Sequence, residues 1–146
     1  MKNDENALVF GRVTYDMMAS WWPSPAALES LPEVAKGMNR SQKYVFSNTL
    51  ERADWENTTL IKGDGVAEMR KLKASRGKNL TILGSGSLIA QLADEGLIDE
   101  YQIMLDPVAL GEGRTLFGGL AKPLELELVS TRTFRSGTIL AVYRPQ

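Results

Sequence analysis

The sequence contains no cysteine and no histidine among its 146 residues. Without cysteine, the chain has neither disulfides nor a thiol nucleophile. Without histidine, a Ser-His-Asp triad, an imidazole general base and the common zinc sites are excluded as well. Any chemistry must therefore depend on carboxylates, lysine, tyrosine, serine or threonine, or on a bound cofactor, for which a protein supplies mainly position and electrostatics.

Long runs of one kind of residue are also missing. No apolar run approaches the roughly 20 residues that span a bilayer, and no signal-peptide pattern opens the chain. The formal net charge is −1 and lysine and arginine form no long run, which argues against nucleic acid as the main partner. We therefore expect a cytoplasmic protein that binds neither membrane nor nucleic acid, and no residue pattern predicts a metal site.

What the chain does have is enough apolar material for a core, because 43% of its residues are hydrophobic. Its length predicts one domain covering residues 1–146. Strand-like and helix-like segments alternate as far as Leu105, which predicts helices packed on a mostly parallel sheet. Near the C-terminus, Ser136-Gly137 separates two strand-like segments and predicts a hairpin. The expected fold is a three-layer α/β domain with a C-terminal antiparallel hairpin.

The most informative stretch runs from Leu80 to Leu105. An apolar segment at residues 80–83 fits a buried strand, and Gly84-Ser85-Gly86-Ser87 then forms a glycine-rich turn. From Leu88 the apolar residues recur at helical spacing until Gly96, a plausible helix stop. A glycine turn before a helix lets backbone N–H groups approach a phosphate closely. A tight turn that binds no ligand fits the same pattern.

A second polar turn, Gly11-Arg12-Val13-Thr14, follows a short apolar strand and opens a helix. A cation in the first turn of a helix is mildly unfavourable, so Arg12 is better explained if an anion binds nearby. Thr14 could hold the same anion or cap the helix. The alternative is a solvent-exposed Arg12 beside a capping Thr14.

A third polar turn, Ser47-Asn48-Thr49, follows the next strand. An acidic residue here would favour a free ribose hydroxyl, whereas small polar residues with Arg52 nearby fit a 2′-phosphate better. An ordinary polar turn is the alternative. In a parallel sheet the three turns lie along one edge, where they could follow an extended nucleotide.

Asp106 is the odd polar residue in the apolar segment at residues 103–108. A carboxyl group in apolar surroundings keeps its proton more readily and can then donate it, so Asp106 is a weak catalytic candidate. The alternative is a solvated carboxylate at a bulge, which Pro107 also favours.

These motifs, in this order, resemble the dihydrofolate reductase-like superfamily, and most closely the reductase domain of the bacterial riboflavin deaminase-reductase. The matching stretches are LVFGRVTYDMM, KYVFSNTL, LTILGSGSLIAQLADEGLIDEYQIMLDPVALGEGRTLF and the terminal hairpin. The resemblance implies an NADPH-dependent reductase that transfers hydride to a small pterin or ribosyl-aminopyrimidine-type heterocycle. A nucleotide-binding or dimer-forming module without turnover is the alternative.

Together with the turns above, the resemblance implies where the ligands bind. The cofactor-binding candidates are Gly11, Arg12, Thr14, Ser47, Asn48, Thr49, Arg52, Gly84, Ser85, Gly86, Ser87 and Leu88. The substrate-side candidates are Gly111, Gly113 and Arg114. Strands in the C-terminal region of the family bury apolar surface between subunits, so the resemblance also implies a homodimer.

Members of the family usually begin with a further strand, turn and helix that precede the first strand found here and line the nicotinamide pocket. In that topology the further strand lies between the strands at residues 80–83 and 99–110. Leaving that gap open would cost about 1–3 kcal/mol per buried backbone group. We therefore expect the two strands to pair directly or to receive a strand from a partner chain, and we expect poor turnover from this chain alone.

Overall fold

The structure is a computed structural model that describes residues 6–75, 79–84, 86–113 and 117–146. The chain divides into two compact units, Met1–Ile89 and Ala90–Gln146. Within the described residues, no helix has the length and apolar content needed to cross a membrane.

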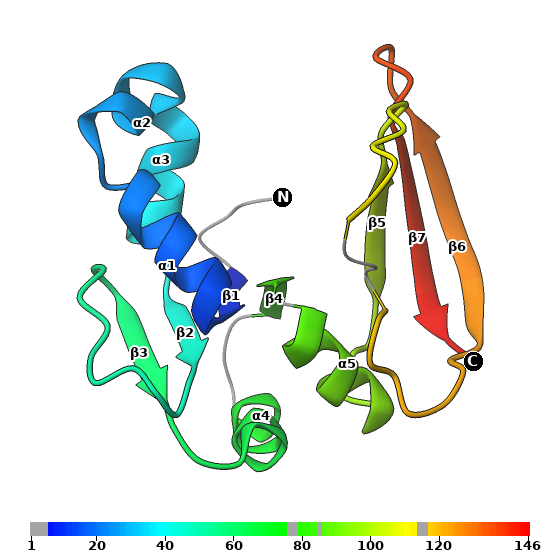
Figure 1. The fold of residues 1–146 in the computed structure, drawn as a ribbon, viewed down its shortest axis with the longest axis horizontal. Coiled ribbons are helices and arrows are strands. Elements are labelled where there is room, and N and C mark those ends of the chain that lie inside the picture. Colours follow the sequence, from blue (N-terminus) through cyan, green and yellow to red (C-terminus); the bar gives the residue numbers. More distant parts are fainter. Residues whose placement is uncertain (1–5, 76–78, 85, 114–116) are drawn as a thin grey trace. The chain divides into compact units, whose positions relative to one another are not determined.

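The first unit is built on a parallel sheet with the strand order β3-β2-β1-β4 (Figure 1). Its strands are β1 (Asn6–Gly11), β2 (Lys43–Phe46), β3 (Thr58–Ile61) and β4 (Asn79–Gly84). The helices between them are α1 (Arg12–Trp21), α2 (Pro25–Ser30), α3 (Pro32–Arg40) and α4 (Gly65–Ala74). A fifth helix, α5 (Gly86–Asp94), begins in the first unit and ends in the second.

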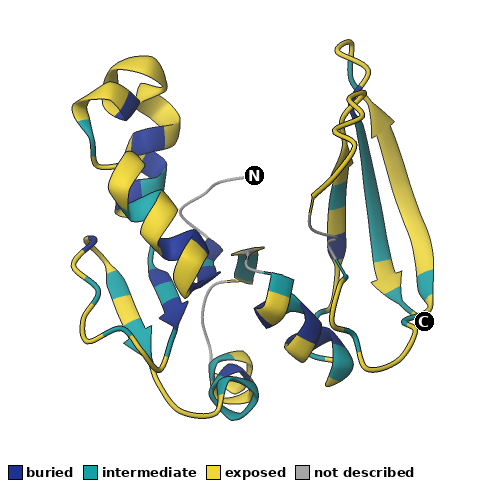
Figure 2. Cartoon of the chain, viewed as in Figure 1, coloured by how far each residue is buried: buried dark blue, intermediate teal, exposed yellow. Residues whose placement is uncertain are grey.

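Aromatic side chains from three segments form the core of the first unit. Phe10 from β1, Tyr15 from α1 and Trp55 from the β2–β3 loop pack with Val45 of β2. The ring centroids lie 6.0–6.5 Å apart, within the range of favourable aromatic pairs. Figure 2 shows the same concentration of buried residues in β1 and β2. The core therefore fixes α1 and the β2–β3 loop against the central strands.

Lys43 is fully buried at the start of β2, although lysine is rarely found in a core. Its Nζ donates to the carbonyl oxygens of Met38 (2.7 Å), Asn39 (2.9 Å) and Ser41 (2.8 Å) at the end of α3. It also lies 4.4 Å from the ring centroid of Trp55. Burial lowers the pKa of Lys43 to about 8, and the charge of Glu56 opposes that shift. The ammonium group thus caps α3 from inside the protein.

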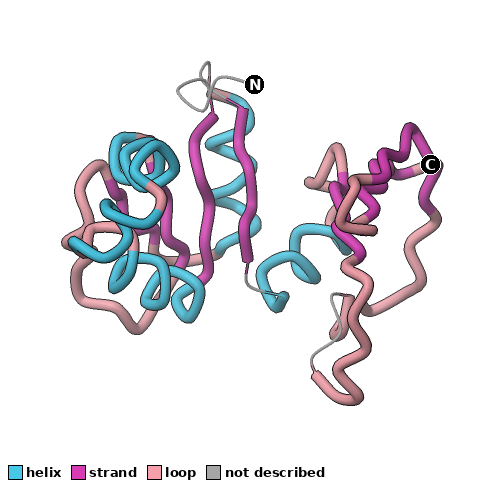
Figure 3. Tube along the Cα trace, turned by 90° about the horizontal axis from the view of Figure 1, so that it is seen from above, coloured by secondary structure: helices cyan, strands magenta, loops and turns pink. Residues whose placement is uncertain are grey.

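The second unit contains an antiparallel sheet with the order β5-β7-β6, formed by β5 (Tyr101–Leu105), β6 (Leu126–Thr133) and β7 (Ile139–Pro145). Figure 3 shows only strands and loops after α5 in this part of the chain. The predicted hairpin is confirmed, since the Phe134 N–H donates to the Thr138 carbonyl at 2.8 Å and Gly137 turns the chain with φ +92°. The α/β class and the parallel sheet are confirmed as well.

The hairpin was expected to extend the parallel sheet, but it belongs to a different sheet. It pairs with β5 in a separate sheet, whereas β4 pairs with β1 in the parallel sheet. In the described residues β4 and β5 therefore do not pair directly, because each belongs to a different sheet. The alternative, a strand from a partner chain, stays a prediction. The expected strand at residues 99–110 also ends early, at Leu105, because the Val108 N–H turns back to the Asp106 carbonyl at 2.8 Å.

Candidate functional site

The three polar turns lie at one edge of the parallel sheet. Strands β2, β1 and β4 are neighbours, with Gly11 in register with Phe46 and Phe10 in register with Gly84. All three run in the same direction, so the turns at residues 11–14 and 47–49, and residues 84 and 86–88 of the third turn, lie at their carboxyl ends. In open α/β sheets this is the edge where ligands bind. The row of turns that the sequence predicted is therefore present.

The first turn leaves the start of α1 open to an anion. Gly11 occupies the N-cap position without a side-chain cap, and the first turn contains no acidic residue. Thr14 is buried and does not cap the helix as one alternative proposed, because it lies inside α1, beyond the cap position. Arg12 Nη1 contacts Asp16 Oδ2 at 3.1 Å, and both side chains are about half exposed. Surface pairs of this kind are weak, so Arg12 can exchange Asp16 for a phosphate.

Ser47 uses its hydroxyl group to shape the second turn. Its Oγ accepts from the N–H groups of Thr49 (3.2 Å) and Leu50 (3.1 Å). It also lies 3.2 Å from the hydroxyl oxygen of Thr49. Ser47 therefore ties the turn together, and the exposed residue Thr49 has its hydroxyl group next to that of Ser47.

Asn48 joins this turn to the one that follows β3. Its Oδ1 accepts from the Gly63 N–H at 2.6 Å, and its Nδ2 donates to the Gly63 carbonyl at 3.3 Å. Asn48 was predicted to contact the cofactor, and its clamp on Gly63 was not predicted. A carboxamide after one strand and a glycine after the next were visible in the sequence, but their pairing depends on the strand register.

The two cations near this turn have different surroundings. Arg52, the expected phosphate ligand, pairs through Nε with Asp54 Oδ2 at 3.1 Å. Lys62 was not predicted. It follows β3 directly, and the Ser47 N–H donates to the carbonyl of the preceding Ile61 at 3.1 Å. Lys62 is exposed and forms no ion pair with any other described residue, so its charge is free for an anion.

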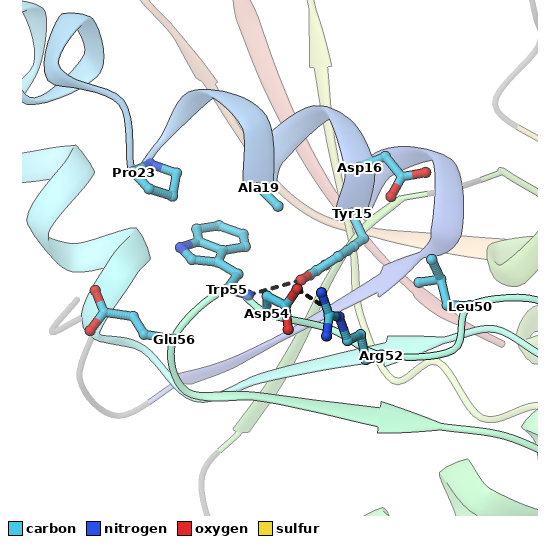
Figure 4. A pocket seen from close by; sticks show the side chains of 9 residues that line it. All are labelled: Tyr15, Asp16, Ala19, Pro23, Leu50, Arg52, Asp54, Trp55 and Glu56. Atoms are coloured by element: carbon cyan, nitrogen blue, oxygen red, sulfur yellow. Dashed lines mark hydrogen bonds and ion pairs between the residues drawn. The ribbon is translucent and has the colours of Figure 1, made fainter.

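Arg52 also lines a pocket of about 430 Å³ between α1 and the β2–β3 loop (Figure 4). The residues that line it are Tyr15, Asp16, Ala19, Pro23, Leu50, Arg52, Asp54, Trp55 and Glu56. In its wall the Tyr15 hydroxyl oxygen accepts from the backbone N–H of Trp55 at 3.1 Å. Because the lining combines one cation with three carboxylates, the pocket is less suited to a phosphate than the turns at the sheet edge.

The third turn joins β4 to α5. Strand β4 ends at Gly84 and α5 begins at Gly86, while Ser85 lies outside the described residues. The first turn of α5 contains no acidic residue, and Leu88 anchors the helix by packing inside, with 6% of its surface exposed. Ser87 is exposed. The start of α5 thus matches that of α1 in offering positive potential without a carboxylate.

The remaining candidates lie in the second unit. Gly111 and Gly113 are exposed with φ +84° and +149°, and Arg114 lies outside the described residues. Asp106 is exposed and accepts from the Thr138 hydroxyl at 2.8 Å. The apolar surroundings that a proton donor requires are absent, so the structure favours the alternative of a solvated carboxylate, here one that ties β5 to the hairpin turn. Within the described ranges, no group of three or more acidic residues could hold a metal ion.

Comparison with known proteins identifies one family. The model of the RibD C-terminal domain matches residues 1–140. Protein YyaP of Bacillus subtilis (strain 168), which is uncharacterised, is 34% identical over 142 residues, covering 97% of this chain and 74% of YyaP. Protein YwjB of the same organism, also uncharacterised, is 34% identical over 91 residues, covering 62% of this chain and 52% of YwjB.

Two solved structures have similar folds. One is named "Putative riboflavin biosynthesis protein" from Shewanella sp. PV-4, with a TM-score of 0.74 and 27% identity over 96% of this chain and 73% of that protein. The other is a pyrimidine reductase-like protein from Corynebacterium diphtheriae, with a TM-score of 0.68 and 15% identity over 99% of this chain and 77% of that protein.

Proposed function

Because the chain belongs to the RibD C-terminal domain family, we propose that it is an NADPH-dependent reductase domain acting on a small pterin or ribosyl-aminopyrimidine-type heterocycle. The observation that carries this proposal is the row of three polar turns at the carboxyl ends of β2, β1 and β4. The name of the Shewanella relative, "Putative riboflavin biosynthesis protein", supports an aminopyrimidine-type substrate.

The residues of the row fit the parts of a dinucleotide. The starts of α1 and α5 carry no acidic residue in the first turn, so their N–H groups suit a pyrophosphate, and Arg12 supplies a counter-charge. The turn at residues 47–49, with Lys62 beside it, suits a 2′-phosphate, because charge-assisted hydrogen bonds are stronger than neutral ones. When bound, NADPH would supply the hydride for a C=N or C=O bond.

A nucleotide-binding module without turnover is the second candidate, and one observation favours it. Asp106, the carboxyl proposed as a proton donor, is exposed and bonded to Thr138. A water molecule would then have to supply the proton. We accordingly expect slow turnover by this chain alone, even if it binds NADPH.

Two measurements test the proposal in sequence. Calorimetric titration with NADPH and NADH should show saturable binding of both, with NADPH bound more tightly. Loss of NADPH absorbance in the presence of pterin and aminopyrimidine substrates should then reveal slow oxidation. Binding without oxidation of any substrate would support the module without turnover, and no binding of either nucleotide would refute both readings.

A further inference from the structure

The pairing of β2 with β3 does not stop at the last residue of either strand. The Ser47 N–H donates to the Ile61 carbonyl at 3.1 Å, which is the last backbone bond between the two segments. Beyond it, the Asn48 side chain both accepts from and donates to the backbone of Gly63, at 2.6 and 3.3 Å. The carboxamide therefore acts as one more rung of the ladder, and Lys62 lies between the two rungs.

We propose that Asn48 is a positioning residue that holds Lys62 beside the turn after β2 and thereby sets the preference for a 2′-phosphate. This inference rests on the proposed nicotinamide function. The resemblance implied direct contact between Asn48 and the cofactor, but both polar atoms of its side chain bond to Gly63, which orients the carboxamide toward that backbone and leaves one N–H and one lone pair for other groups. Its proposed effect on a phosphate is exerted through the backbone that carries Lys62.

The conformation of Gly63 makes the clamp specific. Its φ of +99° lies in the region that favours glycine, although nothing lies within 4 Å of the place where a Cβ would be. Glycine is thus required here by the backbone and not by space. In this conformation the N–H and the carbonyl of Gly63 both reach the one carboxamide of Asn48.

The other positive groups near this turn are less suited to the phosphate. The start of α4 already holds the Asp64 carboxylate, which accepts from the N–H groups of Val66 (3.0 Å) and Ala67 (3.3 Å). Arg52 is paired with Asp54 and lines a pocket that also contains the Asp16 and Glu56 carboxylates, so a phosphate there would face three negative charges. Lys62, in contrast, follows β3 directly and forms no ion pair with another described residue.

Fixing the backbone matters because lysine is a flexible ligand. Ordering a long side chain at a binding site costs conformational entropy, and a mobile backbone would add to that cost. By anchoring Gly63, Asn48 removes the motion of the residue next to Lys62. The benefit is confined to ligands that carry a 2′-phosphate, because the pyrophosphate is bound by other turns.

The test compares 2′,5′-ADP with 5′-ADP as calorimetric probes, because only the first carries the 2′-phosphate. The proteins are the wild type, Asn48→Ala, Lys62→Met and the double variant. Lys62→Met should reduce the preference for 2′,5′-ADP about tenfold, which corresponds to about 1.4 kcal/mol. Asn48→Ala should reduce it several-fold with unchanged affinity for 5′-ADP. The double variant should be no worse than Lys62→Met, since the two residues act as one unit.

Gln42→Ala is the matched control. Gln42 also bridges β2 and β3 by its carboxamide, donating to the Lys43 carbonyl at 3.2 Å and to the Thr59 hydroxyl at 3.3 Å, but at the opposite end of the strands. It should leave the preference unchanged. If Asn48→Ala does not fold, Gly63→Ala strains the same clamp from the other side and should produce the same selective loss.

The outcomes separate this inference from the proposed function. If the wild type binds neither probe nor NADPH, the proposed function fails and this inference fails with it. If the wild type prefers 2′,5′-ADP but Asn48→Ala keeps that preference, weakens both probes equally or adds its effect fully to that of Lys62→Met, the inference alone is overturned.

Discussion

Replacing Lys43 by methionine should change how stability depends on pH. In the folded protein burial lowers the pKa of Lys43 to about 8, whereas an unfolded lysine titrates near 10.5. Between these values the unfolded chain binds a proton that the folded chain has released. The free energy of unfolding therefore rises with pH across this window, and below pH 8 the contribution of Lys43 is constant.

The difference between 10.5 and about 8 corresponds to at most roughly 3 kcal/mol. Solvent screening near Glu56 reduces it, so we expect the wild type to gain about 1–3 kcal/mol relative to Lys43→Met between pH 8 and 10.5. At neutral pH the ammonium stays charged, because three carbonyl oxygens accept its three donors. The prediction concerns the change with pH and not the absolute stability of the variant.

The assay is urea unfolding followed by tryptophan fluorescence at several pH values from 7 to about 10.5. Burial raises the pKa of Tyr101, but that residue is common to both proteins and its contribution cancels in the difference. Lys36→Met, an exposed change on the same helix α3, is the control and should show no such trend. A wild-type minus Lys43→Met difference that is flat or falls with pH would refute the reasoning. If Lys43→Met does not fold, an NMR titration of the Lys43 side chain in the wild type tests the same pKa.

Three further predictions concern the site, the hairpin and assembly. Arg12→Ala should weaken NADPH and NADH equally, about tenfold, because its target is the shared pyrophosphate; unchanged calorimetric affinity would remove Arg12 from the site. Gly137→Ala should lower the free energy of unfolding by about 1–2 kcal/mol, since φ is +92° and the new Cβ would lie 3.3 Å from Pro107 Cγ; an unaltered urea midpoint would contradict this. The chain should be a homodimer, because Met104 and Leu105 on the edge strand β5 are 54% and 64% exposed; a monomeric mass by light scattering at micromolar concentration would count against it.

The row of turns could be predicted from the sequence because it follows from the order of strands and helices alone. Alternating strands and helices imply a parallel sheet, and a parallel sheet brings the ends of its strands to one edge. Polar residues after those strands must then lie near one another. The hairpin at Gly137 was predictable for a similar reason, since a two-residue turn signal is local.

Features that depend on non-local pairing were not predictable. The Asn48–Gly63 clamp requires β2 and β3 to pair in one register, which no local pattern specifies. No local pattern marks Lys43 as buried, because the three carbonyl groups at the end of α3 that accept from its ammonium group are brought to it by the fold. The separation of β4 from β5 into different sheets also depends on pairing and not on the apolar pattern of either strand.

The most direct test of the central claim is an NMR titration of ¹⁵N-labelled protein with NADPH. We expect the largest amide shifts in the turns at residues 11–14, 47–49 and 84–88, with a further shift at Lys62. NADH should reproduce all of them except those at residues 47–49 and 62. Shifts confined to other parts of the chain, or no shifts at saturating NADPH, would contradict that claim.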